Sequence, residues 1–251
     1  MKVLITGAGS GIGKSLALKF AKLGYDLVLV ARNKEKLEEV KSEIGDKVIV
    51  ELYPMDLGNV DNCIKLHNQV KDIDILVNNA GMGKFDEFVD IDLEEELDMI
   101  DINVRAMHVL MKLYLKDMVK KDSGQILNVA SIAGFMAGPL MSTYYATKNY
   151  VVSLSEGVRE ELRKKKSRVE VSILCPGPVK TNFDNVAGVN FSLKGKTSEM
   201  VAKYTIKKLQ KKKFYIVPGI DIKLLRFISK LVPNSLITKI VYNQQKKKKD
   251  V

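Results

Sequence analysis

Short apolar runs alternate with segments of helical periodicity along the sequence. The runs are rich in valine, isoleucine and leucine without polar alternation, which is typical of parallel strands buried on both faces. Seven strands are predicted, at 2–6, 26–30, 48–53, 73–78, 124–130, 169–175 and 214–218. Six helices are predicted, at 11–23, 34–44, 59–71, 92–121, 142–165 and 197–211. This alternation predicts a doubly wound α/β fold, with a parallel sheet of seven strands and helices on both faces.

Length and composition are those of one domain. The chain has 251 residues, and 46% of them are hydrophobic, which is typical of globular proteins. An α/β architecture can hold this length around a single core, and no repeat or linker divides the sequence. We therefore expect one domain over residues 1–219, followed by a C-terminal extension over residues 220–251.

Composition also argues against several classes of protein. Cys63 and Cys175 are too few for a disulfide framework, and no cysteine–histidine cluster suggests a metal, so we expect reduced thiols and a cytoplasmic protein. The net charge of +11 includes lysine runs at 164–166, 211–213 and 246–249, which lack interleaved aromatic residues. This pattern favours a solvated basic surface over nucleic-acid binding. The opening "MKVLIT" is too short an apolar run for a signal peptide, and no stretch reaches the roughly 20 apolar residues of a membrane span.

A glycine-rich turn, "TGAGSGIG" at 6–13, joins the first predicted strand to the first helix. Gly7 allows a tight turn, Gly11 leaves a bare backbone that a phosphate can approach, and Gly13 permits close packing of helix on strand. The N-terminus of the helix then favours a pyrophosphate. Glycines also end strands for steric reasons alone, but the strand–turn–helix context favours a dinucleotide site and a Rossmann-like fold.

The residues after the second strand bear on the choice of dinucleotide. Proteins that bind NAD commonly carry an acidic residue near this point, which holds the ribose 2′-hydroxyl. This chain has Ala31, Arg32 and Asn33 instead, with no carboxylate before Glu35. A guanidinium suits a 2′-phosphate by its charge and by its paired donors. Arg32 therefore predicts a preference for NADP(H), although an ordinary surface arginine is the alternative.

The stretch "TYYATK" at 143–148 places a phenol and an ammonium on one helix face. Tyr144 stands four residues before Lys148, so the two side chains point the same way, whereas Tyr145 is turned aside. A nearby cation favours the phenolate and lowers the pKa of a tyrosine from its usual value of about 10. The pair is therefore either a proton donor for catalysis or two long side chains on a solvated face. The motif alone does not decide between them.

With these motifs the sequence resembles the short-chain dehydrogenase/reductase family over nearly its whole length. The resemblance adds Asp56 after the third strand, "NNAG" at 78–81 and Asn103 in "INV". Ser131 precedes Tyr144 by the family's usual thirteen residues, and "PGPVKT" at 176–181 resembles the segment that lies over the nicotinamide. All of these motifs occur in the family's order.

The resemblance implies a mechanism. Tyr144 would give a proton to the substrate oxygen, and Lys148 would lower the pKa of the tyrosine and hold the nicotinamide ribose. Ser131 would hydrogen-bond the carbonyl, and Asn103 would complete a proton path through a water molecule. The residues expected to bind the cofactor are Gly7, Ser10, Gly11, Ile12, Gly13, Arg32, Asp56, Leu57, Asn79, Ala80, Gly81, Tyr144, Lys148, Pro176, Gly177, Val179 and Thr181.

We therefore expect an NADP(H)-dependent oxidoreductase that reduces a ketone or aldehyde, with NAD(H) as the second choice of cofactor. A non-catalytic NADP(H)-binding sensor on the same fold is the alternative, but such sensors tend to lose the tyrosine or the lysine. An apolar pocket favours a hydrophobic carbonyl compound over a sugar or polyol. Its expected lining is Met82, Phe85, Phe135, Met136, Leu140, Met141, Phe183, Val186 and Phe191.

The C-terminal extension has two amphipathic segments, "LLRFISKLV" and "SLITKIVY", separated by Pro233, which is expected to break or kink the helix. We favour packing of these segments on their own domain or on a partner subunit. Contact with an anionic membrane surface, aided by the lysines at 246–249, is the alternative. The resemblance also implies a homodimer or homotetramer formed through the helices at 92–121 and 142–165.

Overall fold

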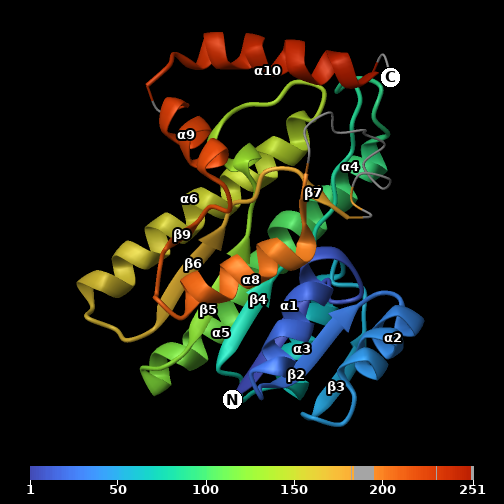
Figure 1. The fold of residues 1–251 in the computed structure, drawn as a ribbon, viewed down its shortest axis with the longest axis vertical. Coiled ribbons are helices and arrows are strands. Elements are labelled where there is room, and N and C mark those ends of the chain that lie inside the picture. The colour runs from blue at the N-terminus through green and yellow to red at the C-terminus, as the bar shows by residue number, and fades with distance from the viewer. Residues whose placement is uncertain (182, 184–194, 230, 250–251) are drawn as a thin grey trace.

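Seven parallel strands form the central sheet, in the order β3-β2-β1-β4-β5-β6-β9 (Figure 1). The structure is a computed structural model that describes residues 1–181, 183, 195–229 and 231–249. The strands are β1 (Lys2–Thr6), β2 (Asp26–Ala31), β3 (Val50–Pro54), β4 (Ile75–Asn78), β5 (Gln125–Val129), β6 (Glu170–Leu174) and β9 (Tyr215–Ile216). Because the strand order reverses between β1 and β4, the sheet is doubly wound, which confirms the predicted fold class.

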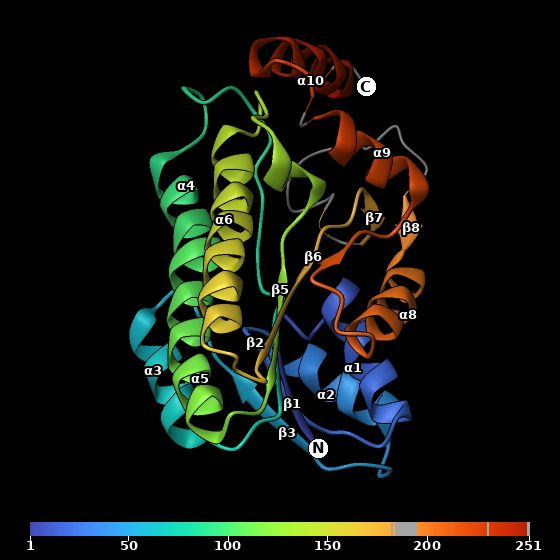
Figure 2. The same ribbon diagram turned by 90° about the vertical axis from the view of Figure 1, so that its left-hand side faces the viewer.

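Helices cover both faces of the sheet (Figure 2). On one face lie α3 (Val60–Gln69), α5 (Met107–Lys121) and α6 (Ser142–Lys164). On the other lie α1 (Gly11–Lys22), α2 (Lys34–Ile44) and α8 (Ser198–Leu209). This arrangement follows from the right-handed crossovers that connect parallel strands.

The core is divided between these two faces by the pleat of the strands. Successive side chains of a strand point to opposite faces. In β1, Leu4 packs into the cluster under α3, α5 and α6, while Val3 and Ile5 pack into the cluster under α1, α2 and α8. All three side chains are fully buried. The continuous apolar runs of the sequence are therefore explained by a sheet that is buried on both faces.

Some elements differ from the predicted ones. The helix expected over 92–121 consists of α4 (Leu93–Ile100), a π-helical turn η1 (Asp101–Ala106) and α5. A π-helical turn inserts one residue into the hydrogen-bond ladder, and apolar periodicity does not reveal it. A 3₁₀ turn, η2 (Ile132–Phe135), follows β5, and a short pair forms between β7 (Val179–Lys180) and β8 (Lys196–Thr197). The last strand is shorter than predicted, since Pro218 follows closely and has no N–H for a ladder.

The C-terminal extension forms two helices, α9 (Ile220–Ile228) and α10 (Asn234–Lys249), on either side of Pro233. Their placement at one end of the molecule is seen in Figure 1. Ile237, Val241 and Gln245 of α10 are buried, so this helix packs on its own chain through one face, as favoured from the sequence. Among the helices that the structure describes, none is long and apolar enough to cross a membrane.

Candidate active site

The site begins at the carboxyl-end edge of the sheet, where the ends of β1 and β4 are joined by hydrogen bonds. The Thr6 hydroxyl accepts from the backbone N–H groups of Asn79 and Ala80, both at 2.9 Å. The Asn79 side-chain amide donates to the carbonyl oxygens of Thr6 at 3.0 Å and Gly7 at 3.1 Å. These contacts fix the glycine turn against the "NNAG" segment, so two parts of the predicted cofactor site are held together.

The glycine turn has the geometry of a phosphate-binding loop. Gly7 and Gly11 have φ angles of 63° and 53°, which favour glycine. A Cβ atom on Gly7 would lie 2.8 Å from the amide nitrogen of Asn79, and one on Gly13 would collide with the carbonyl oxygen of Gly7. Ser10 is the N-cap of α1, but its side chain makes no capping hydrogen bond. The N-terminus of α1 is therefore open to an anion.

Two cations stand at the far end of this site. Arg32 is exposed and lines the cavity, as predicted, and Lys36 lines it too. Asn33 between them caps α2, since its side chain accepts a hydrogen bond of 2.7 Å from the backbone N–H of Lys36. Sequence reasoning missed Lys36. Helical spacing could not have revealed it, because Arg32 precedes Asn33, the N-cap of α2, and so lies outside the helix.

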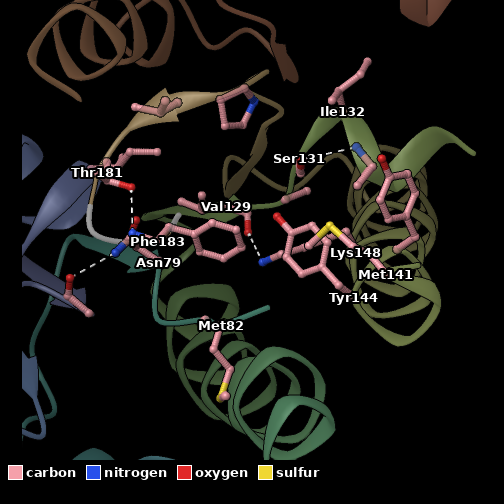
Figure 3. Close-up of a pocket in the computed structure, with 18 of the residues that line it drawn as sticks. Asn79, Met82, Val129, Ser131, Ile132, Met141, Tyr144, Lys148, Thr181 and Phe183 are labelled. Carbon is pink, nitrogen blue, oxygen red and sulfur yellow. Dashed lines mark hydrogen bonds between the residues drawn. The ribbon is translucent and has the colours of Figure 1, made fainter. Parts of the chain in front are cut away.

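Ser131, Tyr144 and Lys148 lie together in the cavity (Figure 3). The Ser131 hydroxyl lies close enough to Tyr144 to lower the pKa of the phenol. The Lys148 ammonium lies 5.7 Å from the centre of the Tyr144 ring and donates to the carbonyl oxygen of Val129 at 3.2 Å. Tyr145 also lines the cavity, and its hydroxyl accepts a 3.0 Å hydrogen bond from the Gln245 amide. The two neighbouring tyrosines therefore have different partners, as their helix positions predict.

Burial sets the pKa values of Tyr144 and Lys148. Burial raises the pKa of Tyr144 to about 12, against the effect of the Ser131 hydrogen bond, which lowers it. Burial also lowers the pKa of Lys148 to about 8. The net pKa of Tyr144 is therefore higher than its usual value, and the lowering effect expected of Lys148 stays a prediction. Loss of solvation disfavours both charged forms, and this effect is the larger one here.

Asn103 lies in the π-helical turn and is almost fully buried. Its amide accepts from the backbone N–H of Met82 at 2.9 Å and donates to the Met82 carbonyl at 2.8 Å and to the Thr147 hydroxyl at 3.1 Å. A Cβ atom on Gly81 would lie 2.8 Å from the Asn103 oxygen and 3.3 Å from the Lys148 ammonium. Gly81 thus lets the asparagine and the lysine approach the same point. The proton path through Asn103 stays a prediction.

One cavity of about 1090 Å³ joins these groups. Of the residues predicted for the cofactor and for catalysis, all line it except Gly13, which packs on Gly7, and Asn103, which stands behind Gly81. The predicted residues that line the cavity are Gly7, Ser10, Gly11, Ile12, Arg32, Asp56, Leu57, Asn79, Ala80, Gly81, Ser131, Tyr144, Lys148, Pro176, Gly177, Val179 and Thr181.

The expected substrate lining is only partly placed in this cavity. Met82, Met136, Met141 and Phe183 line it, whereas Phe85, Leu140 and Phe135 do not. Phe85 and Leu140 pack with Met141 in a small apolar cluster behind the wall. Phe135 instead lies under the guanidinium of Arg226, 4.9 Å from the centre of its ring. Val186 and Phe191 lie outside the described residues.

Sequence reasoning did not assign the C-terminal helices to this site, yet they form part of its wall. Ile222, Leu225 and Ile228 of α9 line the cavity, as do Ile237, Val241 and Gln245 of α10. A Cβ atom on Gly177 would lie 2.5 Å from the end of the Ile222 side chain, so α9 rests directly on the segment at 176–181. The apolar spacing of the tail was the available signal, but it did not reveal which surface the helices cover.

Comparisons with known proteins agree with this geometry. Residues 1–189 match the family profile described as short chain dehydrogenase. An uncharacterised oxidoreductase of Staphylococcus aureus (strain MW2) is 35% identical over 182 residues, which are 71% of this chain and 78% of that protein. An NADP-dependent 3-hydroxy acid dehydrogenase of Schizosaccharomyces pombe is 35% identical over 192 residues, with 73% of each chain covered.

A solved structure shows the same fold. The short-chain dehydrogenase of Sphingobium yanoikuyae in complex with NADPH superimposes with a TM-score of 0.82 and 32% identity, over 87% of this chain and 88% of the other. The chain therefore belongs to the short-chain dehydrogenase/reductase family, and it is an oxidoreductase of that family.

The buried lysine has a consequence for stability. At pH 7 Lys148 is charged in both the folded and the unfolded chain, and its burial disfavours folding. We expect Lys148→Met to raise the free energy of unfolding at pH 7 by up to about 3 kcal/mol, the equivalent of the pKa difference from the usual 10.5. The gain should shrink as pH rises from 8 to 10.5, because the folded chain then increasingly holds neutral lysine. Denaturant unfolding at pH 7 and pH 10 measures both effects.

Lys112→Met is the matched control, since this lysine is exposed on α5 and its removal should change stability little at either pH. A Lys148→Met variant that is less stable than the wild type at pH 7 would contradict the argument. A stability difference that does not change with pH would contradict it as well.

Proposed function

We propose that this chain is an NADP(H)-dependent reductase of hydrophobic ketones or aldehydes. The observation that carries the proposal is the single cavity in which a phosphate-binding turn, a pair of cations and the Ser131–Tyr144–Lys148 group meet a mostly apolar wall. A dinucleotide held along the turn and a carbonyl compound held against Tyr144 would share this space.

The residues of the cofactor half fit a phosphorylated dinucleotide. The turn at Gly7 and Gly11 and the open N-terminus of α1 suit the pyrophosphate, and Arg32 with Lys36 suits a 2′-phosphate. The S. pombe relative is described as NADP-dependent, and the S. yanoikuyae structure is a complex with NADPH, which supports the same cofactor here. NAD(H), which lacks the 2′-phosphate, is the second choice. The bound nicotinamide would supply the hydride, while the chain places and polarises the carbonyl compound.

The chain's own groups support a general-acid mechanism. With its pKa raised to about 12, Tyr144 holds its proton at neutral pH and can donate it from the phenol oxygen to an oxygen that gains negative charge. Ser131 can donate a second hydrogen bond to the same oxygen. Lys148, whose pKa of about 8 leaves it cationic at pH 7, would stabilise the tyrosinate that remains. Asn103 positions the backbone at Met82 beside this group.

The far side of the cavity supports an apolar substrate. Met136, Met141 and Phe183 lie there, together with the inner faces of α9 and α10. A sugar or polyol would bury several hydroxyl groups against mostly apolar side chains, which is unfavourable where they lack hydrogen-bond partners, although Ser229, Gln244 and Gln245 are polar residues of this wall. A hydrophobic carbonyl compound needs one polar contact, and Ser131 and Tyr144 provide it.

The first test compares the two neighbouring tyrosines. We expect Tyr144→Phe to lower kcat by about 10²–10⁴-fold, the usual contribution of a general acid, while NADPH binding stays close to the wild type. Tyr145→Phe is the matched control and removes only the hydroxyl that accepts from Gln245, so turnover should be largely retained. NADPH oxidation with a panel of apolar ketones and aldehydes measures both. Equal loss in the two variants would rule out the assignment, and NADPH binding without turnover of any compound would favour the sensor.

The second test concerns the cofactor. We expect Arg32→Ala and Lys36→Ala each to weaken NADPH binding by about tenfold, since a charge-assisted hydrogen bond contributes about 1.5–3 kcal/mol. NADH binding should be unchanged in both variants. Lys34→Ala is the control, because Lys34 is exposed at the start of α2 and does not line the cavity. Titration of the wild type and the variants with NADPH and with NADH measures these affinities. Wild-type protein that binds NADH as tightly as NADPH would refute the preference.

We further propose that the chain forms a homodimer or homotetramer through α4, α5 and α6. Leu93, Leu97 and Ile100 are exposed on α4 at the spacing of one helix face. We expect the wild type to scatter light as a dimer or larger at micromolar concentration, and Leu93→Glu/Leu97→Glu to scatter as a monomer. Leu23→Glu/Ile49→Glu, also at exposed apolar positions, should leave the mass unchanged. A stable wild-type monomer would contradict the proposal.

A further inference from the structure

The two C-terminal helices carry apolar side chains on two opposite sides. The inner side, with Ile222, Ile237 and Val241, is buried and lines the cavity. The outer side does not touch the cavity and consists of Leu224, Phe227, Leu231 and Leu236, each of which is more than half exposed. We call these four residues the outer apolar face. A helix that only covers a core needs apolar residues on one side, so packing on the domain does not explain this face.

The outer apolar face comprises residues of α9, of the turn that follows it and of α10. Leu224 and Phe227 share one side of α9 at i and i+3, and Leu231 lies in the turn before α10. Leu236 lies in the first turns of α10, just beyond Pro233. Figure 1 shows α10 at the very end of the molecule, with α9 between α10 and the rest of the fold. A group of large exposed apolar side chains of this kind marks an interaction surface.

The charge of the extension defines what it can contact. Between residues 222 and 249 the sequence has eight lysines and arginines and no aspartate or glutamate. Lys223, Lys239 and Lys246 are exposed. A partner for this surface must therefore be apolar and must carry negative charge. A second copy of the same surface fits poorly, because it would bring the exposed Lys223, Lys239 and Lys246 near the same three lysines of the other copy.

Two cations of the extension face aromatic rings of the same chain. The Lys223 ammonium lies 5.9 Å from the centre of the Tyr204 ring. The Arg226 guanidinium stacks over the Tyr215 ring, 3.4 Å from its centre, and also faces Phe135 at 4.9 Å. Together with the contact of Ile222 on Gly177 and the hydrogen bond from Gln245 to Tyr145, it holds the inner side on the domain. The orientation of the two helices is thereby fixed, with the outer apolar face directed away from the body of the protein.

We propose that α9 and α10 dock on the surface of an anionic phospholipid membrane. The outer apolar face enters the boundary between headgroups and acyl chains, and the lysines contact the anionic headgroups. The helices lie along the surface, in keeping with the finding that none of the described helices can span a bilayer. Docking also places the apolar wall of the cavity next to lipid, but binding itself does not depend on the proposed reductase activity.

The test is co-sedimentation of the full chain with lipid vesicles. We expect binding to vesicles of phosphatidylcholine with phosphatidylserine, and at least about tenfold weaker binding to phosphatidylcholine alone. Raising the salt concentration should release the protein, because screening weakens contacts with the headgroups. Equal binding to both kinds of vesicle, or no binding to anionic vesicles at low salt, would overturn the proposal.

Two pairs of variants separate the apolar and the charged contributions. Phe227→Ser/Leu231→Ser should lose most vesicle binding, whereas Leu23→Ser/Ile49→Ser, at exposed positions in the first half of the chain, should bind as the wild type does. Replacement of the lysines at 246–248 by glutamine should weaken binding to anionic vesicles about tenfold or more. The same replacement at 164–166 removes equal charge from the end of α6 and should have a much smaller effect.

Further measurements distinguish the other occupants of this face. The four variants are first compared with the wild type by thermal unfolding, and the lysine variants test the proposal independently if the serine variants do not fold. If the wild type binds no vesicles and Phe227→Ser/Leu231→Ser instead dissociates an oligomer in light scattering, the face is a contact between copies and the proposal is wrong. Vesicle binding by a chain that reduces no carbonyl compound would support docking and refute only the proposed function.

Discussion

The side-chain amide of Asn79 is the interaction on which the site depends. It joins the end of β4 to the end of β1 by donating to the carbonyl oxygens of Thr6 and Gly7. Without it, two carbonyl groups at the carboxyl-end edge would lose their partners, at a cost of about 1–3 kcal/mol each where they are buried. The same contact sets the direction of the chain that leads to Gly81. The glycine turn and the group around Lys148 are therefore parts of one hydrogen-bonded edge.

Much of the fold could be predicted from the sequence because its determinants are local. The apolar runs predict strands that are buried on both faces, and glycines such as Gly7 indicate positions where the backbone needs a positive φ. The placement of Tyr144 and Lys148 on one helix face also follows from spacing alone. The carboxyl ends of parallel strands share one edge, so the residues that follow them were expected to meet, and they line one cavity.

The parts that could not be predicted depend on contacts between distant segments. The pKa of Tyr144 is set by how deeply the surrounding chain buries it, and the sequence pattern suggested the opposite direction. Phe135 was expected in the pocket because of its position in a loop. It instead packs under Arg226, which is ninety-one residues further along the chain. The bond between Gln245 and Tyr145 joins residues one hundred positions apart. The periodicity of a sequence does not predict which distant residues will contact each other.

The close contact between Gly177 and Ile222 constrains how this protein can change in evolution. There is no room for a Cβ atom between the backbone of the segment at 176–181 and the isoleucine that rests on it. A larger residue at position 177 requires the end of the Ile222 side chain to move or a smaller residue to replace it, so the two positions are expected to vary as a pair. New substrate ranges are therefore reached more readily through the outer end of α9 and through α10. The end of α9 that touches the segment at 176–181 is the part least free to diverge.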